Sequence, residues 1–192
     1  MFVSAIVLAA GGSTRLGQPK QLLAFRGRTL LDAALDTARA CAFDQIVVAL
    51  GGAASEVRER VDLSGCEVVD SVHHTDGCSS SIVAALEAVD PHADVLVLLL
   101  GDQPDIDPAS VDALLALGDV PIAVCRYRDG PGHPFLFARA VFAALAELQG
   151  DKAVWKLLES ARWPVAEVDC PGPVPLDVDT WDDYQRLLEN VG

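Results

Sequence analysis

A stretch near the start of the chain places glycines and cations directly behind an apolar run. Gly11 and Gly12 precede Arg15 and Gly17 follows it, and Lys20 stands three residues after Gly17. Glycines let backbone N–H groups approach a phosphate closely, and Arg and Lys bind phosphate oxygens through charged hydrogen bonds. These residue types therefore indicate a site for a phosphorylated ligand.

The order of the residues excludes two common phosphate motifs. The run Gly-Gly-Ser-Thr-Arg-Leu-Gly does not fit the dinucleotide fingerprint G-x-G-x-x-G. Gly12 and Gly17 have the spacing of a P-loop, but Gln18 and Pro19 stand where lysine and serine are needed. The apolar run at 2–10 also lacks a preceding basic residue and a cleavage-type boundary, which argues against a secretion signal.

Two acidic segments supply candidate ligands for a metal ion. Asp102 follows the most apolar run of the chain, and a carboxylate after a parallel strand faces the ligand crevice of an open α/β sheet. Asp177 and Asp179 stand in a D-x-D-T sequence and share one face if that segment is extended. A phosphatase nucleophile pair has the same sequence, but it requires a place on the first strand and partners later in the chain.

These acidic residues also have structural interpretations that the sequence leaves open. Asp102 can cap the turn that follows it, and the D-x-D-T pair can cap the last helix. Asp105 and Asp107 are expected in turn and cap roles, because Pro108 suits the first position of a helix that begins after Asp107.

Alternating strands and helices must position these groups. Apolar, β-branched runs predict buried strands at 3–8, 45–50, 67–69, 95–100 and 121–124. Apolar residues at helical spacing predict helices at 29–40, 55–61, 80–89 and 108–117. This alternation predicts an α/β protein whose parallel sheet is covered by helices on both faces.

The pattern changes after residue 125. It predicts a turn-rich loop at 129–132, a short strand at 134–137, helices at 139–148 and 152–160, a strand at 165–168 and a last helix near 181–188. Because there is no internal repeat or low-complexity tract, we expect this half to elaborate one domain that spans residues 1–192.

The composition restricts the class of protein. Hydrophobic residues make up 51% of the 192 residues, which indicates an ordered globular chain. A net charge of −14 argues against binding a nucleic acid polymer, and an anionic substrate would need local cations or a metal ion. The five cysteines and four histidines form no C-x-x-C or H-x-x-x-H pattern, and no apolar run has membrane-spanning length. A reducing cytoplasm is the expected location.

The segment from Ala9 to Lys20, A-A-G-x-S-x-R-x-G-x-x-K, closely resembles the signature of the MobA-like nucleotidyltransferases, which share the fold of sugar-nucleotide pyrophosphorylases. The resemblance implies a three-layer α/β/α sandwich of GT-A-like type with a mostly parallel sheet. It further implies an N-terminal part that binds the nucleotide and a C-terminal part that binds the acceptor.

The same resemblance assigns roles to individual residues. It implies that the nucleotide is bound by Ala10, Gly11, Gly12, Arg15, Lys20, Gly77, Ser80, Ser81 and Asp102. Arg15, Lys20 and Asp102 are the expected catalytic residues. Asp102 would bind the catalytic Mg²⁺, and Asp179 is favoured over Asp177 as the second metal ligand. Capping of the helix that follows is the structural alternative for the two serines.

Further segments resemble the MocA-type molybdenum cofactor cytidylyltransferases, namely Pro19-Lys20-Gln21-Leu22-Leu23, Gly101-Asp102-Gln103-Pro104 and Gly132-His133-Pro134. This subgroup implies a Mg²⁺-dependent transfer of CMP from CTP to the phosphate of molybdopterin, with release of pyrophosphate. His133 would then contact the acceptor, unless it makes a structural hydrogen bond. A molybdoenzyme or a chaperone is the implied partner.

Three alternatives to that function remain at this point. The first is a nucleotidyltransferase of the same fold with another nucleotide, such as GTP, or another small phosphorylated acceptor. The second is a nucleotide-binding oxidoreductase, against which the failed dinucleotide fingerprint argues. The third is a protein that binds the cofactor without catalysis.

Overall fold

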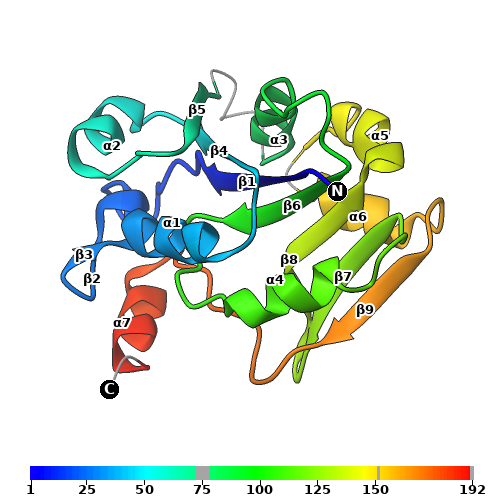
Figure 1. The fold of residues 1–192 in the computed structure, drawn as a ribbon. Coiled ribbons are helices and arrows are strands. Elements are labelled where there is room, and N and C mark those ends of the chain that lie inside the picture. The colour runs from blue at the N-terminus through cyan, green and yellow to red at the C-terminus, as the bar shows by residue number, and fades with distance from the viewer. Residues whose placement is uncertain (72–77, 151, 191–192) are drawn as a thin grey trace.

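The computed structural model describes residues 1–71, 78–150 and 152–190, in which strands and helices alternate along the chain (Figure 1). The strands are β1 (Val3–Ala9), β2 (Ala24–Phe25), β3 (Arg28–Thr29), β4 (Gln45–Leu50), β5 (Glu67–Asp70), β6 (Val95–Leu100), β7 (Ile122–Tyr127), β8 (Gly130–Ala138) and β9 (Val165–Asp169). The α-helices are α1 (Leu30–Ala40), α2 (Ala54–Arg60), α3 (Cys78–Leu86), α4 (Pro108–Leu115), α5 (Phe142–Ala146), α6 (Ala153–Glu159) and α7 (Trp181–Glu189). Two 3₁₀ turns are η1 (Lys20–Leu22) and η3 (Arg139–Val141).

Within the described ranges, seven strands form one sheet in the order β5-β4-β1-β6-β8-β7-β9. The interior strand β1 pairs in parallel with β4 and β6, so that Val7 lies between Val48 and Leu99. β8 runs antiparallel to both of its neighbours, β6 and β7, whereas the β4–β5 and β7–β9 pairs are parallel. The predicted mostly parallel sheet is therefore confirmed.

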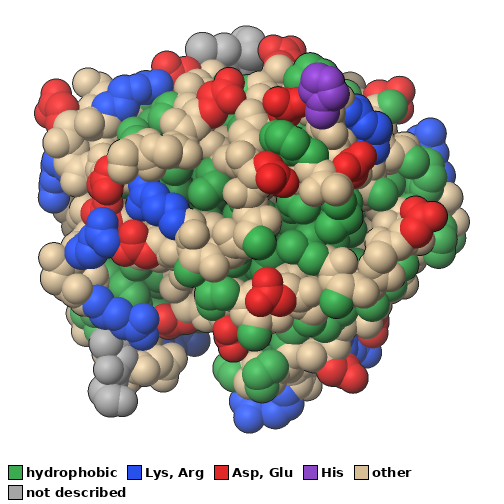
Figure 2. Space-filling view, viewed as in Figure 1, with side chains coloured by type: hydrophobic (Ala, Val, Ile, Leu, Met, Phe, Trp, Pro, Cys, Tyr) green, Lys and Arg blue, Asp and Glu red, His purple; other side chains and the backbone are tan. Residues whose placement is uncertain are grey.

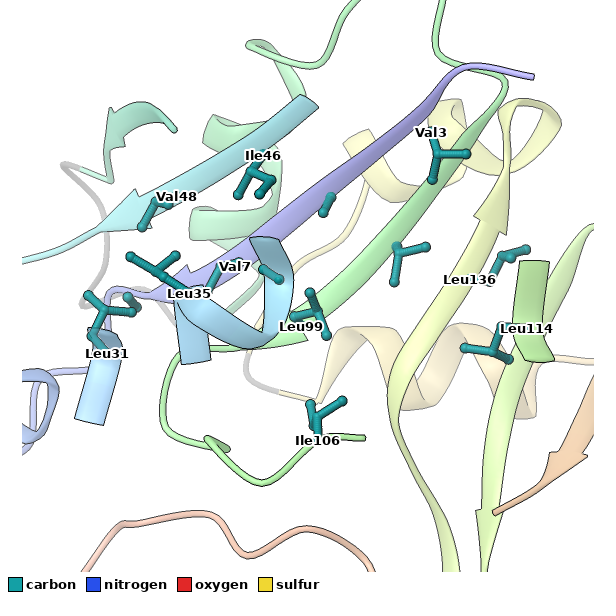
Figure 3. Packing of buried hydrophobic residues seen from close by; sticks show 14 of the residues in the cluster. Val3, Val7, Leu31, Leu35, Ile46, Val48, Leu99, Ile106, Leu114 and Leu136 are labelled. Carbon is teal, nitrogen blue, oxygen red and sulfur yellow. The ribbon is translucent and has the colours of Figure 1, made fainter. Parts of the chain in front are cut away.

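The two faces of the sheet carry two separate apolar cores, because successive side chains of a strand point to opposite faces. Val7 of β1 packs in the same core as Leu31 and Leu35 of α1, on the face that α1, α2 and α4 cover (Figure 3). The adjacent residue Ile6 packs in the core that contains Ile82 of α3, on the face that α3, α5 and α6 cover. Helices on both faces confirm the predicted three-layer arrangement.

A third and smaller core docks the last helix against the beginning of the chain. Its buried members are Leu16, Leu23, Phe25, Leu30, Val178 and Leu187. The hydroxyl of Tyr184 in α7 also donates a hydrogen bond to the carbonyl of Ala24 in β2, at 2.6 Å. Figure 1 shows α7, in red, next to the blue segments around β2, β3 and α1. The residues just before α7 are therefore held close to the glycine-rich stretch.

The strand β8 is longer than the sequence predicted, because the expected loop at 129–132 belongs mostly to it. The register between β7 and β8 shifts after Val124, which pairs with Phe135 while Cys125 pairs with Gly132. His133 and Pro134 form the resulting irregularity, where a proline removes no ladder hydrogen bond. Pairing with β7 thus makes a strand of residues 130–132, whose glycines and proline favour turns.

Two other expectations on secondary structure need correction. The helix predicted at 139–148 is divided into η3 and α5, and the short hairpin of β2 and β3 was not predicted. This hairpin turns at Arg26 and Gly27, which both have positive φ angles, 48° and 78°. Consecutive positive φ angles are typical of a two-residue hairpin turn.

Two further features concern the types of side chain on the surface and the lengths of the helices. On the face shown in Figure 2, Asp and Glu side chains lie interspersed with Lys and Arg side chains and with small apolar areas. In the described part of the chain, each helix is too short or too polar to cross a lipid bilayer.

Candidate active site

Three segments meet at the edge of the sheet where the strand order reverses. β1 pairs with β4 on one side and with β6 on the other, and ligands of open α/β sheets bind beyond the carboxyl ends of strands at such a point. Residues 10–19 follow β1, residues 51–53 follow β4, and Asp102 follows β6. The glycine-rich stretch and the first acidic candidate are therefore neighbours.

Ser13 organises the loop that carries the glycines. It adopts a positive φ of 49°, and its carbonyl accepts a hydrogen bond from the backbone N–H of Gly17 at 3.2 Å. Its hydroxyl oxygen accepts a second hydrogen bond from the backbone N–H of Lys20 at 2.9 Å. Gly11 and Gly12 remain exposed. The serine of the motif thus brings Lys20 next to the exposed glycines.

The side chain of Lys20 lies between two carboxylates. Its Nζ donates to Asp102 Oδ2 at 2.5 Å and to Asp179 Oδ1 at 2.9 Å, and only 14% of the side chain is exposed. Burial disfavours the charged ammonium, but the two carboxylates outweigh it and raise the pKa of Lys20 above its usual value. A Cβ added to Gly11 would come within 3.3 Å of Lys20 Cε, so glycine leaves room for this side chain.

Asp179 also contacts the second cation of the motif. Arg15 Nη2 lies 3.3 Å from Asp179 Oδ2, and the Arg15 side chain is otherwise exposed. The start of α7 is capped by Thr180, whose hydroxyl accepts from the N–H of Asp183 while the Asp183 carboxylate accepts from Thr180. Because Thr180 and Asp183 cap the helix, the carboxylate of Asp179 faces the two cations instead.

Asp177 has a different partner. Gln103 Nε2 donates to Asp177 Oδ1 at 2.6 Å and to the carbonyl of Pro175 at 2.8 Å. Although part of the Asp177 side chain faces solvent, desolvation of its carboxyl group and the negative charge of Asp102 raise its pKa to about 6. Of the two carboxylates in the D-x-D-T sequence, Asp179 contacts Lys20, which also contacts Asp102. Asp177 instead accepts a hydrogen bond from Gln103.

These carboxylates fit a particular kind of metal site. In the ranges that the structure describes, no three His, Cys, Asp or Glu side chains are grouped so that they could hold a metal ion. Two oxygen ligands on one cation nevertheless match the way in which Mg²⁺ is commonly bound, by one or two carboxylates together with substrate phosphates and water. The ammonium between Asp102 and Asp179 marks a position where a positive charge is stabilised.

A hollow of about 390 Å³ lies beside the glycine loop. Its lining comes from Gly11, Gly12, Ser13, Thr14, Gly17, Gln18 and Pro19, and from Gly52, Ala53 and Glu56 after β4. The second group was missed from the sequence, where the signal was a glycine pair directly after an apolar strand. Gly51 is sterically required, since an added Cβ would lie 2.3 Å from the carbonyl oxygen of Ala10.

The structure does not bring the predicted serines to this hollow. Ser81 is buried and its hydroxyl donates to Ser71 Oγ at 3.0 Å. Ser80 lines a different hollow of about 810 Å³, which lies between β5, α3 and the segment after α5. Gly77 lies outside the described residues, as does the Cys78 side chain. A role of this segment in binding a nucleotide stays a prediction.

The remaining candidate residues, two aspartates and a histidine, have different contacts in the structure. Asp107 caps α4 by accepting from the N–H of Ala109, as expected, whereas Asp105 forms an ion pair with Arg26 at 3.0 Å. The His133 ring stacks on Phe135 with centroids 4.0 Å apart, and burial lowers its pKa to about 3. Because β8 is antiparallel to β6, His133 lies near the same sheet edge as Asp102, with a neutral ring at pH 7.

The mostly parallel sheet with helices on both faces is a fold of the GT-A-like type. The model of the MobA-like NTP transferase domain matches residues 5–167, and the chain belongs to this family. It is therefore an enzyme of the nucleotidyltransferase class.

Curated relatives that match nearly the whole chain include an oxidoreductase and a cytidylyltransferase. Nicotine blue oxidoreductase from Paenarthrobacter nicotinovorans is 32% identical over 97% of this chain and 96% of its own length. Molybdenum cofactor cytidylyltransferase from Escherichia coli is 26% identical with the same coverage of both chains.

Solved structures include a relative of higher identity. Rv0371c from Mycobacterium tuberculosis is 54% identical, with a TM-score of 0.93 and 98% of each chain covered. A crystal structure of Rv0371c in complex with manganese gives a TM-score of 0.90 at 51% identity, with 98% of this chain and 99% of that chain covered.

Proposed function

We propose that this protein transfers CMP from CTP to the phosphate of a molybdopterin-type acceptor and releases pyrophosphate. The observation that carries the proposal is the Lys20 ammonium between Asp102 and Asp179, directly beside an exposed glycine loop. The likeness to the Escherichia coli cytidylyltransferase and the segments around Lys20, Asp102 and His133 support CTP and molybdopterin as substrates.

In this proposal the glycine loop and the cations bind the triphosphate. Backbone N–H groups of Gly11 and Gly12 donate to phosphate oxygens, and the exposed guanidinium of Arg15 can contact two of them at once. Asp102 and Asp179 would hold Mg²⁺, which would neutralise negative charge on the triphosphate when bound. Lys20 supplies a positive charge for the α-phosphate.

The chemistry needs no covalent intermediate on the protein. An oxygen of the acceptor phosphate forms a bond to the α-phosphorus in line, while the bond from that phosphorus to the bridging oxygen breaks and pyrophosphate leaves. Lys20 and Arg15 stabilise the negative charge that develops on the transferred group and the leaving group. A neutral His133 can offer one N–H donor to the acceptor without adding charge.

Ligand binding and turnover test this function. We expect CTP with Mg²⁺ to raise the melting temperature more than GTP, ATP or UTP, because a selective ligand stabilises the folded state by mass action. Equal shifts for all four nucleotides would contradict the assignment of cytidine. Pyrophosphate release with CTP and molybdopterin separates an enzyme from a non-catalytic binder of the cofactor.

A matched pair of variants tests the site. Asp102→Asn is expected to lower turnover by about 10³-fold, because it removes a charge that organises the transition state. Asp105→Asn changes a carboxylate on the same loop whose ion-pair partner is Arg26, and we expect turnover close to wild type. Wild-type turnover in Asp102→Asn would overturn the mechanism.

A second candidate function has one observation in its favour. The relative named as an oxidoreductase is 32% identical, more than the 26% of the cytidylyltransferase. An oxidoreductase that uses a nicotinamide cofactor would gain thermal stability from NADH or NADPH. A shift with these cofactors and none with any nucleoside triphosphate would favour this candidate.

A further inference from the structure

Two buried glutamines at the sheet edge make the same unusual set of contacts. Gln21 and Gln103 have exposed fractions of 3% and 2%. In each, Nε2 donates to two acceptors, whereas Oε1 is buried and has no hydrogen-bond partner in the part of the chain that is described. Gln21 follows Lys20, and Gln103 follows Asp102.

Gln21 binds the backbone where the chain leaves β1. Its Nε2 lies 2.7 Å from the carbonyl oxygen of Ala9 and 3.2 Å from that of Gly11. These carbonyls flank Ala10, at the entrance of the glycine loop. Because Gln21 and Lys20 are adjacent in η1, this contact fixes the loop relative to the backbone that carries the Lys20 ammonium.

Gln103 joins the two segments that carry carboxylates. Its Nε2 contacts the carbonyl oxygen of Pro175 and Oδ1 of Asp177, while its own backbone follows Asp102. The amide therefore connects the loop after β6 with the segment that leads to Asp179. The contact fixes the distance between the carboxylates of Asp102 and Asp179 without touching either of them.

The chemistry of the contacts requires an amide at both positions. All four acceptors are oxygen atoms, so each site needs an NH₂ group that points at them. A glutamate of the same shape would place oxygen against oxygen. An apolar side chain of similar length would avoid the cost of the unpaired buried Oε1, but it would take the donor away from two acceptor oxygens at each site. An amide is therefore needed at each position to hold these acceptors in place.

We propose that Gln21 and Gln103 are positioning residues for different ligands of the same site. Gln21 shapes the glycine loop for a nucleoside triphosphate, and Gln103 spaces the carboxylates for a divalent cation. The inference rests on the proposed function, because that function supplies the two ligands.

Binding measurements on methionine variants test the inference, since methionine has a similar length and no amide. We expect Gln103→Met to weaken Mn²⁺ binding, measured by electron paramagnetic resonance of free Mn²⁺, by about 10- to 100-fold. In titration calorimetry at saturating Mn²⁺, its affinity for CTP should change by less than about threefold. Gln21→Met should instead weaken the binding of CTP by about 10- to 100-fold and change the affinity for Mn²⁺ by less than about threefold. Gln103→Glu and Gln21→Glu should weaken the same ligand more than methionine does.

Gln45 provides a matched control at the far end of the sheet. Its Nε2 donates to Glu67 and to the carbonyl of Ala88, and its Oε1 accepts from Ser4 and from the N–H of Asp90. Because this amide is fully paired, Gln45→Met should lower the melting temperature and leave both affinities unchanged.

The outcomes separate the inference from the proposed function. If wild-type protein binds neither Mn²⁺ nor CTP, the proposed function fails and the inference fails with it. If wild-type protein binds both and the Gln21 and Gln103 variants bind them equally well, only the inference is overturned. Equal loss of both ligands in both variants would indicate a general structural role and would also overturn it.

Discussion

The glycine loop and the carboxylate segments lie at one edge of the sheet but are built in different ways. The glycine loop is formed by local contacts, such as that between the hydroxyl of Ser13 and the N–H of Lys20, and it offers backbone groups. The carboxylate segments offer side chains that distant parts of the chain bring together, since Lys20 and Asp179 are 159 residues apart. A local sequence motif can therefore indicate that a ligand binds, whereas tertiary packing determines which charged side chains surround that ligand.

Lys20 contacts both regions, and its replacement should change turnover and Mn²⁺ affinity in opposite directions, with the largest effects of the variants that compare the two regions. We expect Lys20→Met to lower turnover about 10²-fold, because the transition state loses a positive charge. The same variant should bind Mn²⁺ about tenfold more tightly without nucleotide, because no ammonium competes for Asp102 and Asp179. Turnover assays and Mn²⁺ titrations measure the two effects. Weaker Mn²⁺ binding in Lys20→Met would contradict the competition that the contacts imply.

The two capping boxes allow a smaller and closely matched comparison. Thr29 caps α1 with Asp32, beside the glycine loop, and Thr180 caps α7 with Asp183, next to Asp179. Each change to alanine should cost about 1 kcal/mol of unfolding free energy, measured by chemical denaturation. Only Thr180→Ala should also weaken Mn²⁺ binding, because the N–H of Asp179 donates to the same Asp183 carboxylate at 3.3 Å. An equal loss of Mn²⁺ affinity in Thr29→Ala would show that the two regions are not independent.

The smallest expected effect concerns the crowded carboxylates. The pKa of Asp177 is raised to about 6 in the folded protein, from an ordinary value of 3.8. The folded state thus binds this proton more tightly than the unfolded state, and ionisation of Asp177 destabilises the fold above pH 6. Asp177→Asn should therefore melt slightly higher than wild type at pH 8, with the difference fading as the pH falls from 6 to 4. Calorimetric scans across this range measure it, and a difference independent of pH would contradict the raised pKa.

The sequence predicted the parts of the molecule that depend on local patterns. The strands β1, β4 and β6 and the helices between them follow from apolar periodicity, and they place Asp102 at the correct edge of the sheet. Packing on both faces of the sheet follows from the same alternation.

Features that depend on long-range pairing were harder to predict. The first residues of β8 have turn-forming types and become a strand because β7 pairs with them, whereas β6 pairs with residues 135–138. The preference for Asp179 over Asp177 came from a family resemblance, whereas its contacts with Lys20 and Arg15 need the docking of α7. Gln21 and Gln103 stand in segments that resemble the MocA-type enzymes, but the sequence assigns them no role, since it does not show which partners an amide meets in the fold.

The contact between Arg15 and Asp179, whose positions differ by 164 residues, has a consequence for the synthesis of the protein. A ribosome adds about 5–20 residues per second, so roughly 8–33 s pass between the emergence of these two side chains. During that interval the glycine loop exists without one of its carboxylate partners. A nascent chain is therefore expected to gain its affinity for nucleotide and metal only after α7 has been made and has docked, so ligand binding reports the completion of folding.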